Sequence, residues 1–226
     1  LIGRALFFAG LAIIEAVAIT EDGGIIPTTS VGNSASFAIF AEKVIVEINT
    51  NLSPAFEGLH DIYIPSYRPT RQAIPLTQVD ERIGTHAINI DPAKIVGIVF
   101  NNDLHDSPST VTAPDDETQS IANHLIAFFE KEVAEERLPR NLGPLQAGIG
   151  SIANAVLTGL KDSNFEDLIM YSEVLQDCTF ELIDAGKMKF ASGSSITLSA
   201  KYGEKVFNNL EQYKDKLVLR PQEISN

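Results

Sequence analysis

Residues 168–186 read LIMYSEVLQDCTFELIDAG, and this stretch decides the fold class. Its first four residues form a short apolar run that is typical of a buried strand. The segment 174–186 is typical of a helix, and Gly186 is a residue type that commonly ends one. A strand that leads directly into a helix predicts one unit of an α/β sheet. Glu173 lies at the junction between the two.

The same alternation recurs on both sides of this stretch. The apolar runs 12–19 and 94–100 predict buried strands, and the alternating segment 43–49 predicts another. Residues 115–138 predict an amphipathic helix that packs on a sheet, with acidic residues in its first turn and Pro139 at its end. We therefore expect an α/β fold with largely parallel sheets flanked by helices.

Two segments interrupt the alternation. Residues 50–92 are rich in proline and polar residues, which predicts an extended excursion over the surface. Residues 101–116, NNDLHDSPSTVTAPDD, are typical of a linker between domains. The linker predicts a division of the chain into a first domain over residues 1–108 and a second over residues 109–226.

Composition excludes some classes of function. The formal net charge of -13 argues against a nucleic-acid-binding protein, which needs basic residues for phosphate contacts. A single cysteine rules out an intramolecular disulfide and favours a reducing compartment, by default the cytoplasm. The apolar run 1–19 is interrupted by Glu15 and has no basic segment before it, so it predicts globular structure rather than a membrane anchor.

Glu173 and a glycine loop form the strongest candidate site. In open α/β sheets, ligands bind beyond the carboxyl ends of the strands, where Glu173 and the segment GIGS (148–151) both fall. Gly148 and Gly150 allow backbone N–H groups to approach a ligand, and such donors stabilise an oxyanion when a carboxylate attacks a carbonyl. From pattern alone, an acid such as Glu173 is more often a charge that stabilises a helix start than a nucleophile, and the loop is as compatible with a tight turn as with a ligand site.

The other reactive residue types give weaker signals. Cys178 lies within the predicted helix with no histidine near it in sequence, which favours a buried packing residue over a nucleophile. His60, His86, His105 and His124 show no metal-ligand spacing, so we expect no metal site.

Six segments taken together resemble the acetyl-CoA hydrolase/transferase family, which includes the succinyl-CoA:acetate CoA-transferases, a branch of the class I CoA-transferases. They run through nearly the whole chain and are AITEDGGIIPTTSVGNS (18–34), DERIG (80–84), DPAKIVGIV (91–99), PLQAGIGSIANAVLTGL (144–160), YSEVLQD (171–177) and LVLRPQEISN (217–226). The resemblance implies tandem CoA-transferase-type α/β domains, of which this chain holds the later part of the first and the earlier part of the second.

The resemblance also implies roles for single residues. Glu173 matches the family's nucleophile, and the backbone near Ile149 matches its oxyanion donor, with Gly148 and Gly150 shaping the turn. Asn226 matches a family asparagine near the acyl and carboxylate site. Ser151 stands where many members have asparagine.

The function implied is transfer of CoA between an acyl-CoA, such as acetyl-CoA or succinyl-CoA, and a small carboxylate such as acetate. Coenzyme A is then a substrate rather than a permanently bound cofactor. The expected partners are the acyl-CoA and carboxylate substrates, without a membrane or nucleic acid, and the resemblance is compatible with a homodimer. The expected location is the cytoplasm, or the mitochondrion in a eukaryote. The alternatives are an acetyl-CoA hydrolase, a non-catalytic fragment of such an enzyme, and a sugar-phosphate isomerase-like activity with Glu173 as general base.

Overall fold

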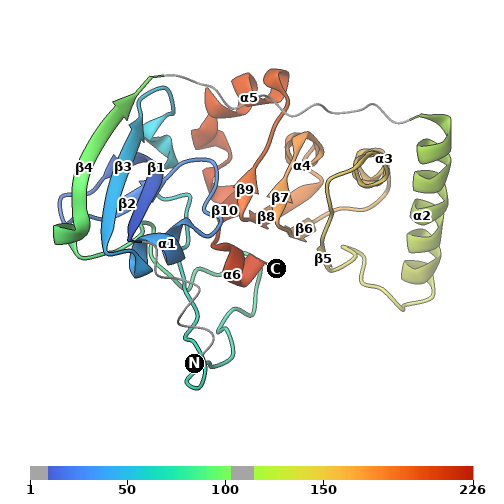
Figure 1. Ribbon diagram of the computed structural model, residues 1–226. Helices are drawn as coiled ribbons and strands as arrows, with labels where there is room; N and C mark the ends of the chain where they lie inside the picture. Colours follow the sequence, from blue (N-terminus) through green and yellow to red (C-terminus); the bar gives the residue numbers. More distant parts are fainter. Residues whose placement is uncertain (1–9, 103–114, 226) are drawn as a thin grey trace.

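The computed structural model describes residues 10–102 and 115–225, and within these ranges the chain forms two sheets of four strands each and a small sheet of two (Figure 1). The first sheet has the order β2-β1-β3-β4, with β1, β3 and β4 parallel and β2 antiparallel to β1. Its strands are β1 (Leu11–Ile19), β2 (Ile25–Pro27), β3 (Lys43–Asn49) and β4 (Ile95–Asn101), and the helix α1 (Ser34–Phe40) connects β2 to β3.

The first sheet is covered on one face by the described residues. Along β1, Ala12 and Ile14 are buried while Leu11 and Ile13 are exposed. The edge strand β4 is largely exposed, with Phe100 at 74%. The expectation of a strand at 94–100 is confirmed, but the expectation that it is buried is wrong. An apolar run predicts a strand without showing whether both of its faces are covered.

The segment 50–92 is irregular apart from two short 3₁₀ helices, η1 (Pro54–Phe56) and η2 (Pro92–Lys94). Figure 1 shows part of it as a long loop below the two sheets. The predicted surface excursion describes residues 66–73, which are all exposed. It misses residues 59–62, which are buried between the two halves of the chain.

The second sheet is fully parallel and has the order β10-β8-β6-β5. The pair β7-β9 extends beyond it. The strands are β5 (Pro144–Leu145), β6 (Leu168–Tyr171), β7 (Val174–Leu175), β8 (Met188–Gly193), β9 (Ser195–Ile196) and β10 (Leu217–Leu219). The expectation of largely parallel sheets in an α/β fold is therefore confirmed.

Helices alternate along the chain with the strands of the second sheet, and α2 precedes the first of these strands. They are α2 (Asp116–Ala134), α3 (Ser151–Lys161), α4 (Asp177–Asp184), α5 (Ala200–Phe207), the short α6 (Gln222–Ser225), and the 3₁₀ helices η3 (Leu210–Gln212) and η4 (Lys214–Lys216). The helix expected over 174–186 starts later, because Val174 and Leu175 pair with β9 first. None of the helices in the described residues is both long enough and apolar enough to cross a membrane.

The helix α2 begins where the sequence predicts but packs elsewhere. Asp115 caps it by accepting a hydrogen bond from the backbone N–H of Thr118 at 2.8 Å. Its main neighbour is α3 rather than a sheet, which corrects our expectation (Figure 1). The missing side chain of Gly159 on α3 leaves room for Ile126, which would lie only 2.5 Å from an added Cβ atom.

The two halves of the chain share one buried core and direct backbone hydrogen bonds. The N–H of Asp61 donates to Leu219 O at 2.9 Å, and the N–H of Leu219 donates to Leu59 O at 3.0 Å. The N–H of Val31 donates to Ser194 O at 2.9 Å. Residues from both halves therefore meet at the carboxyl ends of the second sheet. The division at residue 108, which lies outside the described residues, remains a proposal.

Candidate active site

Glu173 lies two residues beyond the end of β6, at the carboxyl edge of the second sheet. Its backbone oxygen accepts hydrogen bonds from Ser194 N at 2.7 Å and from Ser195 N at 3.1 Å. These two bonds fasten the β6–β7 junction to the neighbouring β8–β9 junction. The backbone that carries the carboxylate is thus held by the sheet, and the side chain remains partly exposed.

The glycine loop follows the adjacent strand. Leu145 of β5 pairs with Met170 of β6, so the two strands are neighbours, as the candidate site requires. The hydroxyl of Ser172 donates to Ala147 O at 2.9 Å. Ser172 and Ala147 are the residues directly before Glu173 and Gly148, so this bond joins the start of the glycine loop to the backbone segment that carries Glu173.

The glycine loop is open to the outside. Ile149 is 71% exposed, and Gly148 and Gly150 are exposed as well. A Cβ atom added to either glycine meets no described atom within 4 Å. Gly150 is the N-cap residue of α3 and offers no side chain to the first turn, so the N–H groups there are available to a negatively charged ligand.

Gln222 is a site residue that sequence reasoning missed. Its Nε2 atom donates to Oε1 of Glu173 at 2.8 Å. Gln222 begins α6, directly after β10, and it belongs to the RPQEISN segment from which only Asn226 was assigned a role. Asn226 itself lies outside the described residues. The RPQEISN segment is visible in the sequence, but the sequence does not show that this segment reaches Glu173.

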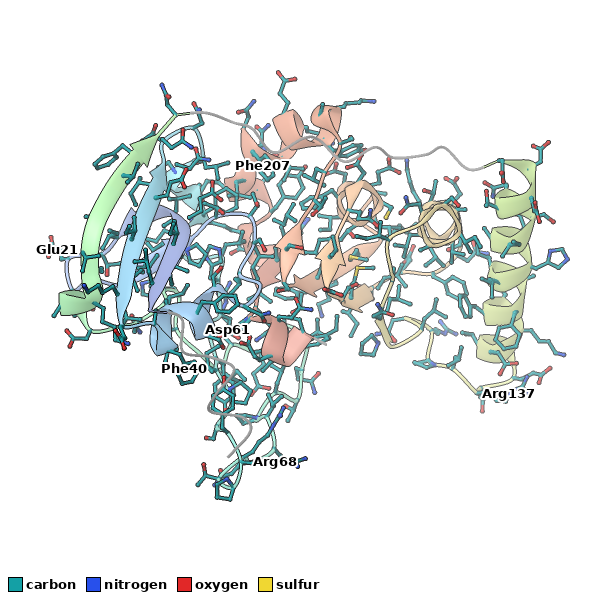
Figure 2. All side chains as sticks on the ribbon, viewed as in Figure 1. Glu21, Phe40, Asp61, Arg68, Arg137 and Phe207 are labelled. Atoms are coloured by element: carbon teal, nitrogen blue, oxygen red, sulfur yellow. The ribbon has the colours of Figure 1, made fainter. Side chains whose placement is uncertain are left out.

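A buried ion pair between the halves of the chain supports this arrangement. Arg220, two residues before Gln222, pairs with Asp61, and both side chains are at most 1% exposed. Figure 2 shows Asp61 at the centre of the molecule, between the two sheets. Burial lowers the pKa of Arg220, which the Asp61 carboxylate opposes. Arg220 Nε also donates to Ser192 Oγ at 2.9 Å.

The DERIG segment completes the environment of this ion pair. The N–H groups of Ile83 and Gly84 donate to Oδ1 of Asp61 at 3.0 and 2.6 Å. A Cβ atom on Gly84 would lie 2.2 Å from Ile62 O, so only glycine fits there. The guanidinium of Arg220 also donates to the backbone oxygen of Glu81. This segment therefore positions β10 and α6 rather than contacting Glu173.

The remaining reactive residue types do not extend the site. Cys178 is 5% exposed, and burial raises the pKa of its thiol to about 11, which confirms the prediction of a packing residue. His60 is fully buried, and burial lowers its pKa to about 4. Among residues 10–102 and 115–225, no three side chains of the His, Cys, Asp or Glu types gather as metal ligands.

Comparison with known proteins identifies the family. The model of the acetyl-CoA hydrolase/transferase N-terminal domain matches residues 6–100. An acetyl-CoA hydrolase of Schizosaccharomyces pombe is 49% identical over 215 residues, which cover 95% of this chain and 41% of that protein. The chain belongs to the acetyl-CoA hydrolase/transferase family. A succinyl-CoA:acetate CoA-transferase of Clostridium kluyveri is 46% identical over 216 residues, or 96% of this chain and 40% of that protein.

Solved structures agree on the fold. A 4-hydroxybutyrate CoA-transferase of Porphyromonas gingivalis matches 99% of this chain and 47% of its own, with a TM-score of 0.63 and 18% identity. RipA of Yersinia pestis matches 95% of this chain and 41% of its own, with a TM-score of 0.61 and 17% identity. The chain therefore corresponds to part of a CoA-transferase-type fold, spanning about two fifths of the length of the curated relatives.

Proposed function

We propose that the full-length protein cleaves the thioester of an acyl-CoA through a covalent intermediate on Glu173. The observation that supports this most directly is the placement of Glu173 beside the glycine loop at the carboxyl edge of one sheet. A carboxylate nucleophile next to free backbone N–H groups is the arrangement that acyl transfer needs. Coenzyme A is a substrate in this proposal, not a resident cofactor.

The first step is attack by a carboxylate oxygen of Glu173 on the acyl-CoA carbonyl carbon. The carbon–sulfur bond breaks, CoA leaves as a thiolate, and an acyl-glutamyl anhydride forms. Negative charge develops on the substrate carbonyl oxygen, and N–H groups of the loop around Ile149 would stabilise it. The thiolate then attacks the glutamyl carbonyl, which releases the acyl group as a carboxylate and leaves a glutamyl-CoA thioester.

Transfer and hydrolysis differ only in what resolves the covalent intermediate. An acceptor carboxylate attacks the thioester and leaves with CoA by the reverse of the first steps, whereas water would release free CoA and restore Glu173. The acetyl-CoA hydrolase name of the Schizosaccharomyces pombe relative, shared by most of the relatives compared, favours water. The Clostridium kluyveri relative bears the transferase name. Hydrolysis is thus the function that the relatives' names support better, and transfer is the second candidate.

The test is an assay of the full-length protein with succinyl-CoA in the presence and absence of acetate. Formation of acetyl-CoA that requires acetate supports transfer, and equal release of free CoA in both reactions supports hydrolysis. The Glu173→Gln variant must abolish whichever activity is found. Undiminished activity in this variant would exclude Glu173 as the nucleophile under either name.

A further inference from the structure

The carboxylate of Glu173 is held by one of its two oxygens. Oε1 accepts the hydrogen bond from Gln222 Nε2 at 2.8 Å, and no residue in the described ranges donates a hydrogen bond to Oε2. A carboxylate with two free oxygens can rotate and present either one. Because Oε1 accepts the bond from Gln222, only Oε2 lacks a donor, and the hydrogen bond to Oε1 sets the direction in which Oε2 points.

The donor is itself held rigidly. The backbone N–H of Gln222 donates to Gly32 O at 2.9 Å, in the loop between β2 and α1. The hydroxyl of Tyr171, at the end of β6, donates to Ile224 O, and the hydroxyl of Ser36 on α1 donates to Glu223. In Figure 1, α6 accordingly lies between α1 and the strands of the second sheet. The short helix α6 is thus fixed from two sides.

The strand before α6 is fixed as well. The N–H of Arg220 donates to Gly193 O at 2.8 Å, and its guanidinium pairs with Asp61 inside the protein. The path from this ion pair to Gln222 is two residues long. A donor that is anchored in this way keeps a side chain near one orientation, which is what reaction at a single oxygen requires.

From this geometry we propose that Gln222 is the positioning residue that directs Oε2 of Glu173 at the acyl-CoA carbonyl, an inference that rests on the proposed function. An uncharged amide suits the task, because it orients the carboxylate without the full positive charge that would weaken it as a nucleophile. After attack, Oε2 becomes the bridging oxygen of the anhydride, and Oε1 is the glutamyl carbonyl oxygen. The amide of Gln222 then still faces Oε1 when thiolate attacks that carbonyl.

The competing explanation is that the bond only fastens α6 to β6. Of the titratable groups next to Glu173 and Gln222, Tyr171 donates to Ile224 O and Oε1 of Glu223 accepts from Ser36, whereas Oε2 of Glu223 is buried with no donor in the described residues. Because Nε2 of Gln222 lies 2.8 Å from Oε1 of Glu173, a change in charge at position 222 acts directly on Glu173. This separates the two explanations, because a purely structural bond affects the amount of folded protein and not the pH dependence of turnover.

The experiment compares Gln222→Met and Gln222→Glu in the full-length protein. Gln222→Met keeps the length of the side chain and removes the donor, so kcat should fall about 10- to 100-fold with KM within about threefold. Gln222→Glu puts two carboxylates at hydrogen-bonding distance, so the pair retains one proton near neutrality, and the rate should increase with pH as that proton leaves. Gln212→Met and Gln212→Glu are the matched controls, since Gln212 is exposed on η3 and its side chain hydrogen-bonds only to Asn209 among the described residues.

The outcomes separate this inference from the proposed function. A lower kcat in Gln222→Met together with a shifted pH profile in Gln222→Glu, with both controls unchanged, supports it. Wild-type rates and pH profiles in both Gln222 variants overturn it while the Glu173-dependent activity stands. Equal loss at every pH, accompanied by a lower melting temperature, also overturns it in favour of the structural bond. Activity that survives Glu173→Gln overturns the proposed function and this inference with it.

Discussion

Glu15 and Glu173 are two carboxylates in similar positions that differ in how many of their oxygens accept a hydrogen bond. Each lies on or just beyond a strand of a mainly parallel sheet, and each accepts a hydrogen bond on Oε1 from a side-chain amide at 2.8 Å, from Asn49 and Gln222 respectively. Oε2 of Glu15 also accepts a hydrogen bond from Thr28 Oγ1 at 2.9 Å. Oε2 of Glu173 has no such donor among the described residues.

The difference follows from where each residue lies on its strand. Glu15 is still within β1, where it pairs in register with Glu47 of β3, and its side chain accepts hydrogen bonds from Asn49 on β3 and from Thr28. Glu173 has left β6 and follows a sheet edge bordered by a glycine loop. In our proposal, a carboxylate oxygen without a donor, at a sheet edge that also carries the glycine loop, marks the reactive position.

The largest expected effect comes from exchanging the two acids for amides. Glu173→Gln should lower turnover by about 10³-fold or more, because the nucleophile is lost. Glu15→Gln should leave turnover within about twofold and lower the free energy of unfolding by about 1 kcal/mol, because one hydrogen bond to a carboxylate is lost. Steady-state assays and urea unfolding of the two variants make the measurement. Comparable loss of turnover in both variants would end the distinction between the two acids.

Removal of the buried guanidinium of Arg220 should disturb the surroundings of Glu173 more than those of Glu15. Arg220→Met leaves the carboxylate of Asp61 buried without its partner, which should lower the free energy of unfolding by about 3–5 kcal/mol. Chemical denaturation gives this value. We also expect kcat to fall where the protein is still folded, since Arg220 lies two residues before Gln222. A loss of stability below about 1 kcal/mol would show that the ion pair does not hold the halves together.

Acid should weaken the region around Thr28 through His60. The Nε2 atom of His60 lies 3.0 Å from Thr28 O, and burial lowers the pKa of His60 from 6.5 to about 4. The unfolded chain binds a proton at His60 below about pH 6.5 while the folded chain does not until about pH 4, so stability decreases as the pH falls through this window. The loss is on the order of 3 kcal/mol.

The check on this prediction is urea unfolding of the wild type and of His60→Phe from pH 7 to pH 4. The variant should have lower stability at pH 7 but a smaller decrease toward pH 4. An equal decrease in both proteins would mean that His60 does not remain neutral in the folded state.

The smallest effect is expected at Cys178. Cys178→Ala should keep turnover within about twofold and cost roughly 1 kcal/mol of stability, as removal of a small buried side chain does. In the wild type, iodoacetamide should react slowly with the folded protein at pH 8, because burial holds the pKa of this thiol at about 11. Fast alkylation that abolishes activity would favour the Cys178 thiol over Glu173 as the nucleophile.

The sequence predicts the elements of this fold better than their surroundings. The strands near 12–19, 43–49 and 168–171 and the start of α2 at its Asp115 cap follow from local patterns and are confirmed. Which faces are covered does not follow, because coverage depends on contacts far apart in the chain. The exposure of β4 and the packing of α2 on α3 are examples.

The candidate site divides in the same way. The acid after a strand and the glycine loop after its neighbour are local features, so the sequence could bring Glu173 and the loop together through the general rule for sheet edges. The approach of Gln222 to Glu173 spans 49 residues, and the pairing of Arg220 with Asp61 spans 159. No local sequence pattern predicts contacts between residues so far apart in the chain. Only the three-dimensional structure shows that the DERIG segment and Arg220 both bind Asp61, and that Gln222, two residues after Arg220, binds Glu173.

The most direct test of the central claim is chemical trapping of the covalent intermediate. The full-length protein is incubated with acetyl-CoA, treated with borohydride, which reduces a glutamyl-CoA thioester to an alcohol, digested, and mapped by mass spectrometry. We predict reduction at Glu173 alone, with Glu15 unchanged and no product in Glu173→Gln. An enzyme that turns over acetyl-CoA while Glu173 remains unmodified would contradict the account.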